Sequence, residues 1–137
     1  MMDRPRRGWW GYVKWVIRDQ PEKRRELEAM RSAGGFASDG TPRATEARRT
    51  TEDRALRGFT GQKAREYEAV EAATAETRTY GNGALRLKFV DLVFWRRSHT
   101  LEGAAMVCHI SRRTAIRYHG DFIRLVAEKM GFDIEGR

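Results

Sequence analysis

Four residues near the C-terminus have the side chains and the spacing that reading the edges of DNA bases requires. Arg112, Arg113, Ile116 and Arg117 follow Ser111. A serine in front of a helix is a favourable N-cap, because its hydroxyl accepts a hydrogen bond from a free amide of the first turn. On a helix that begins there, the four side chains share one face. Arginine can donate two hydrogen bonds to a guanine, and an apolar side chain can contact a thymine methyl. The spacing therefore predicts a base-reading helix.

The stretch 100–130 predicts the two helices that would position this face. The first is short, is capped by Thr100 and ends at Cys108, and residues 109–111 form a tight turn. After the turn, apolar residues recur at helical spacing and predict one buried face: Ala115, Tyr118, Phe122, Leu125 and Val126. A short helix, a tight turn and a second helix with a basic start are typical of a helix-turn-helix, whose second helix enters the major groove.

Residues at the starts of the two helices are candidates for contacts to DNA phosphates, because the first helix of such a unit crosses the backbone. These candidates are Arg96, Arg97, Thr100, Ser111 and Thr114. The alternative is an ordinary helical hairpin with a solvated basic face. Clustering of the arginines in the first two turns, and alanines where the helices would cross, favour DNA binding.

The overall charge agrees with a polyanionic partner. The formal net charge is +8 and the pI is about 10.2. Residues 1–25 carry eight Lys/Arg against three Asp/Glu, residues 26–95 carry eleven of each, and residues 96–137 carry eight against five. A basic excess favours nucleic acid first and an anionic membrane surface second. No apolar run is long enough to span a membrane, and no secretory signal is visible, so we expect a cytoplasmic protein.

Nothing in the sequence indicates an enzyme. The single cysteine, Cys108, excludes an internal disulfide and lies among apolar residues, so we expect a buried, inert thiol. His99, His109 and His119 have too few carboxylates or thiols near them for a metal site. We therefore expect no catalytic residues, no metal and no cofactor.

The remaining chain predicts an all-α fold of five or six helices in three parts. Residues 1–32 form a Trp-rich helical arm, with one helix over Trp9–Arg18 and a second that opens at Pro21. Residues 33–44 are a glycine-rich flexible linker. Residues 45–137 form a helical body that contains the helix-turn-helix.

Within the body, we expect a helix with a thin apolar seam over 45–79, interrupted at Gly58 and Gly61, and then a turn at 81–83. The apolar stretch 84–97 predicts a central core helix beneath the helix-turn-helix. Six side chains should be buried between this helix and the motif: Phe94, Ala105, Ile110, Ala115, Phe122 and Val126.

The N-terminal apolar stripe predicts an interface between copies of the chain. One helix-turn-helix contacts only a short stretch of DNA, and a symmetric dimer doubles the contact. We expect a dimer or small homo-oligomer joined through Trp9, Trp10, Val13 and Val16, or through the seam on the 45–79 helix. The alternative is that the tryptophans fold back and complete the core of their own subunit.

The C-terminal half resembles phage transcriptional regulators of the RinA/ArpU type. The matching features are Phe94-Trp95-Arg96-Arg97, then His-Thr-Leu-Glu from residue 99, Ile-Ser-Arg-Arg-Thr from residue 110, and Leu-Val-Ala-Glu-Lys-Met-Gly from residue 125. The N-terminal YVKWVIRDQPEKRRELEAM resembles the opening of the same family, whereas the linker and the 45–79 helix match in character only. The resemblance implies a DNA-binding activator of late genes in a phage or prophage, working in the cytoplasm of a bacterial host.

The C-terminal module is also similar to the sigma-factor region that reads the −35 promoter element. This similarity implies the fold and the groove placement, but nothing here resembles the segment that melts the −10 element. RNA polymerase is a further candidate partner. His109 stands where many helix-turn-helix units carry glycine. Two alternatives stay open: a small terminase subunit that forms rings on packaging-site DNA, and a protein-binding adaptor that uses the Trp-rich N-terminus.

Overall fold

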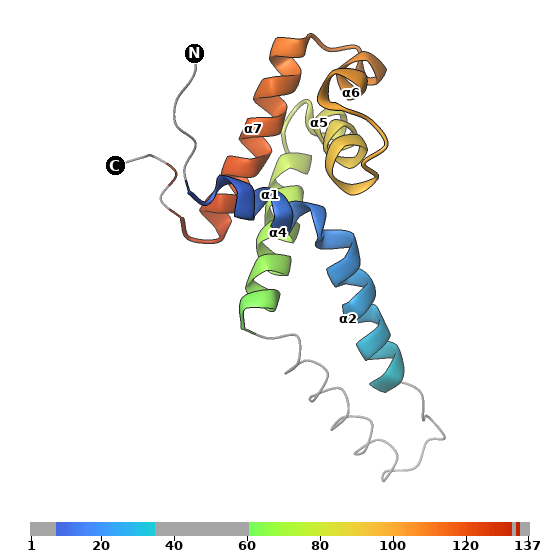
Figure 1. Ribbon diagram of the computed structural model, residues 1–137, viewed down its shortest axis with the longest axis vertical. Helices are drawn as coiled ribbons and strands as arrows, with labels where there is room; N and C mark the ends of the chain where they lie inside the picture. The colour runs from blue at the N-terminus through green and yellow to red at the C-terminus, as the bar shows by residue number, and fades with distance from the viewer. Residues whose placement is uncertain (1–7, 35–60, 133, 135–137) are drawn as a thin grey trace.

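The computed structural model describes residues 8–34, 61–132 and 134, and over these ranges the chain is helical with no strand. Six α-helices and one π-helical segment are present in the described ranges (Figure 1): α1 Trp10–Arg18, α2 Gln20–Gly34, α4 Gln62–Arg78, α5 Gly83–Val90, η1 Asp91–Trp95, α6 Leu101–Cys108 and α7 Arg112–Lys129. The prediction of an all-α fold is confirmed.

Helix α7 is the element around which the others pack. It contacts α4, α6, α1 and α5. α5 runs directly into η1, and both contact α6. α1 crosses α4 and α7, and α2 continues from it after a bend at Asp19 and runs alongside α4 (Figure 1). The C-terminal helix pair therefore rests on α5 and η1, while α1 closes the opposite part of the body.

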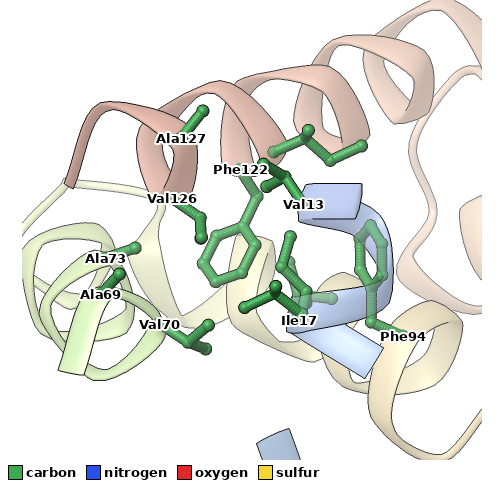
Figure 2. Close-up of a cluster of buried hydrophobic side chains, with 12 residues drawn as sticks. Val13, Ile17, Ala69, Val70, Ala73, Phe94, Phe122, Val126 and Ala127 are labelled. Atoms are coloured by element: carbon green, nitrogen blue, oxygen red, sulfur yellow. The ribbon is translucent and has the colours of Figure 1, made fainter. Parts of the chain in front are cut away.

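The main core lies where α1, α4 and α7 cross (Figure 2). Its buried side chains come from five elements: Val13, Val16 and Ile17 of α1, Ala69, Val70 and Ala73 of α4, Val90 of α5, Phe94 of η1, and Phe122, Ile123, Val126 and Ala127 of α7. Full burial of one Val, Ile or Phe side chain is worth about 1.5–3 kcal/mol. Helix α1 is therefore a structural part of the core.

This packing corrects the predicted interface between copies. Val13 and Val16 are fully buried inside their own chain, so their assignment to a subunit interface is wrong. Trp9 and Trp10 are half-buried against the same core, and the Trp9 ring stacks on Phe132 with centroids 6.0 Å apart. The alternative, in which the tryptophans complete the core of their own subunit, therefore holds for Trp9 and Trp10, whereas Trp15 is 52% exposed.

The predicted N-terminal arm and linker also differ from the structure where residues are described. α1 belongs to the core, and α2 continues through Gly34, so the start of the predicted linker is helical. Residues 35–44, together with 45–60 of the predicted body, lie outside the described residues. Helix α4 begins directly after Gly61, which has a φ of 68°, whereas the predicted interruption at Gly58 lies outside the described residues. The apolar seam of α4 packs on α1 and α7 within the chain.

A second core cluster lies beneath α6. Its buried members are Phe89, Leu92, Ala104, Ala105, Cys108, Ala115 and Tyr118. Of the six side chains predicted to be buried beneath the motif, five are buried in one of the two clusters, and Ile110 is partly buried against the second. Cys108 is buried as predicted, and burial raises the pKa of its thiol.

Within the stretch 84–97, the predicted helix ends at Trp95, and its buried side chains are Phe89, Val90, Leu92 and Phe94. Its second half is wound more loosely. The amide of Arg96 donates to the carbonyl of Asp91 at 2.7 Å. A hydrogen bond between residues five positions apart defines a π-helical turn. Just before Arg96, the indole Nε1 of Trp95 donates to the carbonyl of Ile17 at 3.0 Å. This hydrogen bond therefore joins the π-helical segment to the C-terminal end of α1.

A glycine is required at the first residue of α5, where the chain turns from α4 into α5. A Cβ built on Gly83 would lie 2.3 Å from the carbonyl oxygen of Thr77, well inside any tolerable contact. The predicted turn at 81–83 is thus confirmed as a place where two backbones approach closely.

Candidate nucleic-acid interface

Side-chain caps fix the starts of α6 and α7. The hydroxyl oxygen of Thr100 accepts from the amide of Gly103 at 3.0 Å, and that of Ser111 accepts from the amide of Thr114 at 3.0 Å. Each bond satisfies one of the amides that the first turn of a helix leaves unpaired. Both predicted caps are confirmed, so the sequence sets the first residue of each helix.

The turn between α6 and α7 is closed by two backbone hydrogen bonds and one left-handed residue. The amide of Ile110 donates to the carbonyl of Ala105 at 3.0 Å, and the amide of His109 donates to that of Met106 at 3.2 Å. His109 has φ 58° and ψ 43°. This is the Schellman pattern, in which glycine is common, and its usual apolar contact is supplied by the partly buried Ile110. Histidine occupies a glycine position here.

Small residues let α6 and α7 pack closely, and polar contacts hold α7 against α5. Ala104 and Ala105 of α6 share a buried cluster with Ala115 of α7. On the next turn of α7, the Tyr118 ring meets Phe89 edge-on with centroids 6.1 Å apart, and Asn82 Nδ2 donates to the Tyr118 hydroxyl at 3.0 Å. The Tyr118 hydroxyl thus accepts a hydrogen bond from outside the cluster, while the ring is buried within it. The orientation of α7 is therefore fixed by packing.

All four base-reading candidates lie on the exposed face of the first turns of α7. Ile116 is 48% exposed, so its apolar side chain is accessible on this face. Arg113 and Arg117 flank it and form no ion pair within the described ranges. Arg112 differs, because its Nε lies 3.1 Å from Glu102 Oε2 on α6. The four side chains thus lie on one face, and only Arg112 among them forms an ion pair within the described residues.

The phosphate candidates differ in what they have left to donate. The Arg96 guanidinium pairs with Asp91 at 2.8 Å. Arg97 is exposed, has a left-handed φ of 50° and forms no ion pair with a described residue. The Ser111 hydroxyl donates to Thr114 Oγ1 at 3.0 Å, so its proton is used inside the cap. Thr100 only accepts in its cap, so its hydroxyl proton is free to donate outward. Thr114 Oγ1 likewise only accepts, from Ser111, so Arg97, Thr100 and Thr114 are the candidates that keep a donor for a phosphate.

Two features of this surface were missed by the sequence analysis. Met106 is 76% exposed and Val107 is 36% exposed, so with Ile116 the α6–α7 pair carries three of the five exposed large hydrophobic residues in the described ranges. The other feature is the pairing of Glu102 with Arg112. Glu102 lies in the first turn of α6, and only the fold of the turn brings it beside a residue ten positions later.

A cavity of about 400 Å³ lies between α4, α5 and α7, and none of the four base-reading candidates lines it. The two arginines in its lining already have partners, since Arg86 and Arg124 lie 3.3 Å and 3.0 Å from Asp121. The Arg86 guanidinium also lies over the Tyr118 ring at 4.5 Å. These charges serve to join α5 to α7.

In the described parts of the chain, no cluster of three His, Cys, Asp or Glu residues is arranged to hold a metal ion. None of the described helices is both long and apolar enough to cross a membrane.

Comparison with protein-family models, with curated proteins and with solved structures finds no match to this chain.

Proposed function

We propose that this chain is a sequence-specific DNA-binding protein and that α7 is inserted into the major groove. One observation carries the proposal. The capped α6–turn–α7 unit exposes Arg113, Ile116 and Arg117 together on the first turns of α7, and neither arginine is paired within the described residues. A helix-turn-helix presents the N-terminal part of its second helix to base edges, which is where these side chains lie.

The chemistry of the face suits a base pair better than a protein surface or a membrane. Arginine discriminates guanine by two parallel hydrogen bonds, and each such contact is worth about 1–3 kcal/mol. Ile116 between the two arginines supplies an apolar contact of the kind that selects a thymine methyl. Arg97 and Thr100, beside the start of α6, are the groups that we expect to donate to phosphates. Such contacts position the protein and do not specify sequence.

The resemblance to RinA/ArpU-type regulators supports a role for DNA binding in transcriptional regulation. On that basis, the protein regulates late genes of a phage or prophage, as an activator, with double-stranded DNA as its partner and RNA polymerase as a candidate second partner. We expect two or more copies on the operator, because a single module contacts few base pairs. The surface that joins the copies excludes Val13 and Val16, which are buried within one chain.

The proposal is tested by fluorescence anisotropy with a labelled random-sequence duplex at several salt concentrations. The natural chain should bind, and its affinity should fall steeply with salt because bound protein displaces counterions. The double variant Arg113→Ala, Arg117→Ala should bind more weakly. The matched control is Arg25→Ala, Arg31→Ala, which removes the same charge from exposed positions on α2. The control should bind nearly as the natural chain does.

Two results would contradict the proposal. Absence of duplex binding at low salt would exclude DNA as the partner. Equal losses in the two double variants would show that only net charge matters, and that the α7 face has no special role. Light scattering on the complex adds a further distinction: a ring-sized particle would favour a small terminase subunit over a regulator.

A further inference from the structure

The contact between Glu102 and Arg112 joins the two helices of the proposed DNA-binding face. Arg112 Nε donates to Glu102 Oε2 at 3.1 Å, and it is the only ion pair between α6 and α7 in the described ranges. The contact is made through Nε, so the two terminal nitrogens of the guanidinium take no part in it. The side chains are 70% and 64% exposed.

Stability does not account for this pair. An ion pair between two exposed side chains contributes little to folding, because water and salt screen it and both side chains lose rotamer freedom. Binding strength does not account for it either, since a carboxylate on a face that approaches phosphates is repelled by them. Glu102 therefore works against non-specific affinity, and its use must lie in what it does to Arg112.

We propose that Glu102 is a positioning residue that sets the base specificity of Arg112, an inference that rests on the proposed function. Arginine has five N–H donors in a rigid plane. With Nε bonded to Glu102, the outward edge of the guanidinium presents Nη1 and Nη2 side by side. That edge matches the O6 and N7 acceptors of a guanine in the major groove. The recognised element is thus a guanine opposite the first turn of α7.

Without Glu102, the Arg112 side chain has several rotamers that reach a phosphate instead of a base. A phosphate contact strengthens binding to every sequence equally. Glu102 thus favours specificity over affinity, and its removal should move the two quantities in opposite directions. A residue that only supports the fold would lower both together.

The test compares Glu102→Ala and Glu102→Gln with the natural chain, first on a site selected from random duplexes and then on single-base-pair variants of that site. Glu102→Ala should reduce the preference for guanine at one position by about tenfold or more, the loss expected when a bidentate contact is lost. The same variant should bind random duplex several-fold more tightly. Glu102→Gln should also bind random duplex more tightly but should keep the guanine preference, because its amide oxygen still accepts from Nε.

Two further variants identify the partner and the effect of charge. Arg112→Ala should lose the preference at the same position, and adding Glu102→Ala to it should cause no further loss, as a double-mutant cycle requires of two groups that act as one. Glu22→Ala removes a carboxylate from an equally exposed pair, Glu22 with Arg25 at 2.8 Å on α2. It should leave every base preference unchanged.

The possible failures separate the inference from the function beneath it. If the natural chain binds no duplex, the proposed function and this inference are both overturned. If Glu102→Ala binds duplex with all base preferences intact, or if Glu102→Gln loses the guanine preference as fully as Glu102→Ala does, only the positioning role is overturned. Melting temperatures should be nearly equal for the natural chain and both Glu102 variants, so misfolding would be recognised directly.

Discussion

Lys23 of α2 and Glu66 of α4 meet in the interior of the protein, with Lys23 Nζ 3.3 Å from Glu66 Oε1. The lysine is 1% exposed, and Asp19 gives it a second carboxylate at 3.0 Å. The Tyr12 hydroxyl of α1 donates to the other oxygen of Glu66. One buried lysine therefore ties together α1, α2 and α4, alongside the exposed pair of Arg24 with Glu71 at 2.6 Å.

Removing one member of this buried network should destabilise the protein strongly. Lys23→Ala leaves the Glu66 carboxylate buried without its cation, so the free energy of unfolding should fall by about 3–5 kcal/mol. The measurement is urea unfolding followed by circular dichroism. The double variant Lys23→Met, Glu66→Leu should recover much of the loss, because no buried charge remains. A loss below about 1 kcal/mol for Lys23→Ala would mean that the pair is hydrated, as surface pairs are.

His109 should be replaceable by glycine with a gain in stability. Its φ of 58° lies in the left-handed region, which is unfavourable by about 1–2 kcal/mol for a residue with a Cβ. Glycine loses more chain entropy on folding, so the net gain of His109→Gly should be about 0.5–1 kcal/mol. The β-branched control His109→Val should lower stability. Thermal unfolding of the two variants measures both effects, and a destabilised glycine variant would show that the imidazole makes a contact that matters.

Ala105→Leu should disturb both stability and DNA binding. Ala105 is buried in the cluster beneath α6, and its carbonyl accepts the hydrogen bond that closes the turn. Added methylene groups in a packed site typically destabilise by about 1–3 kcal/mol. The melting temperature should fall and specific binding should weaken, because α7 would be displaced from α6. Met106→Leu, at a neighbouring exposed position, is the control and should leave the melting temperature unchanged.

The Cys108 thiol should react slowly in the folded protein. Burial raises the pKa of the thiol, so less thiolate is present at a given pH than in the unfolded chain. Alkylation by iodoacetamide should be slow at pH 8 and fast in urea, with the pH profile of the folded protein displaced upward. Because the pKa of the thiol is higher in the folded protein, the stabilisation that the buried thiol contributes is complete below the ordinary thiol pKa. This stabilisation is lost as the pH rises through the pKa of the folded protein. Cys108→Ala should remove that part of the alkaline loss, and equal alkylation rates with and without urea would contradict the burial.

The α6–turn–α7 unit could be predicted from sequence because its signals are local. Thr100 and Ser111 lie at the two cap positions, and apolar residues at helical spacing define the buried face of α7. The same pattern could not say which surface the Val13–Ile17 stripe would cover. An amphipathic stripe buries equally well against its own chain or a second copy, and only the packing of α1 on α4 and α7 decides this.

Other features depend on contacts between distant parts of the chain. A lysine three residues inside a charged helix gives no sign that it will be buried, yet Glu66 meets Lys23 across more than forty residues. The pairing of Glu102 with Arg112 likewise requires the turn to form first. The extra residue per turn in η1 has no local signature in an almost uniformly apolar stretch.

Selection from a library of random duplexes is the most direct test of the claim that α7 reads DNA sequence. The natural chain should enrich one motif that contains guanines opposite Arg113 and Arg117. The Arg113→Ala, Arg117→Ala variant should keep weak, salt-sensitive binding and lose the preference at those positions, whereas Arg25→Ala, Arg31→Ala should enrich the unchanged motif. If the natural chain enriches no sequence, or if the α7 variant enriches the same motif as the natural chain, α7 is not the base-reading helix.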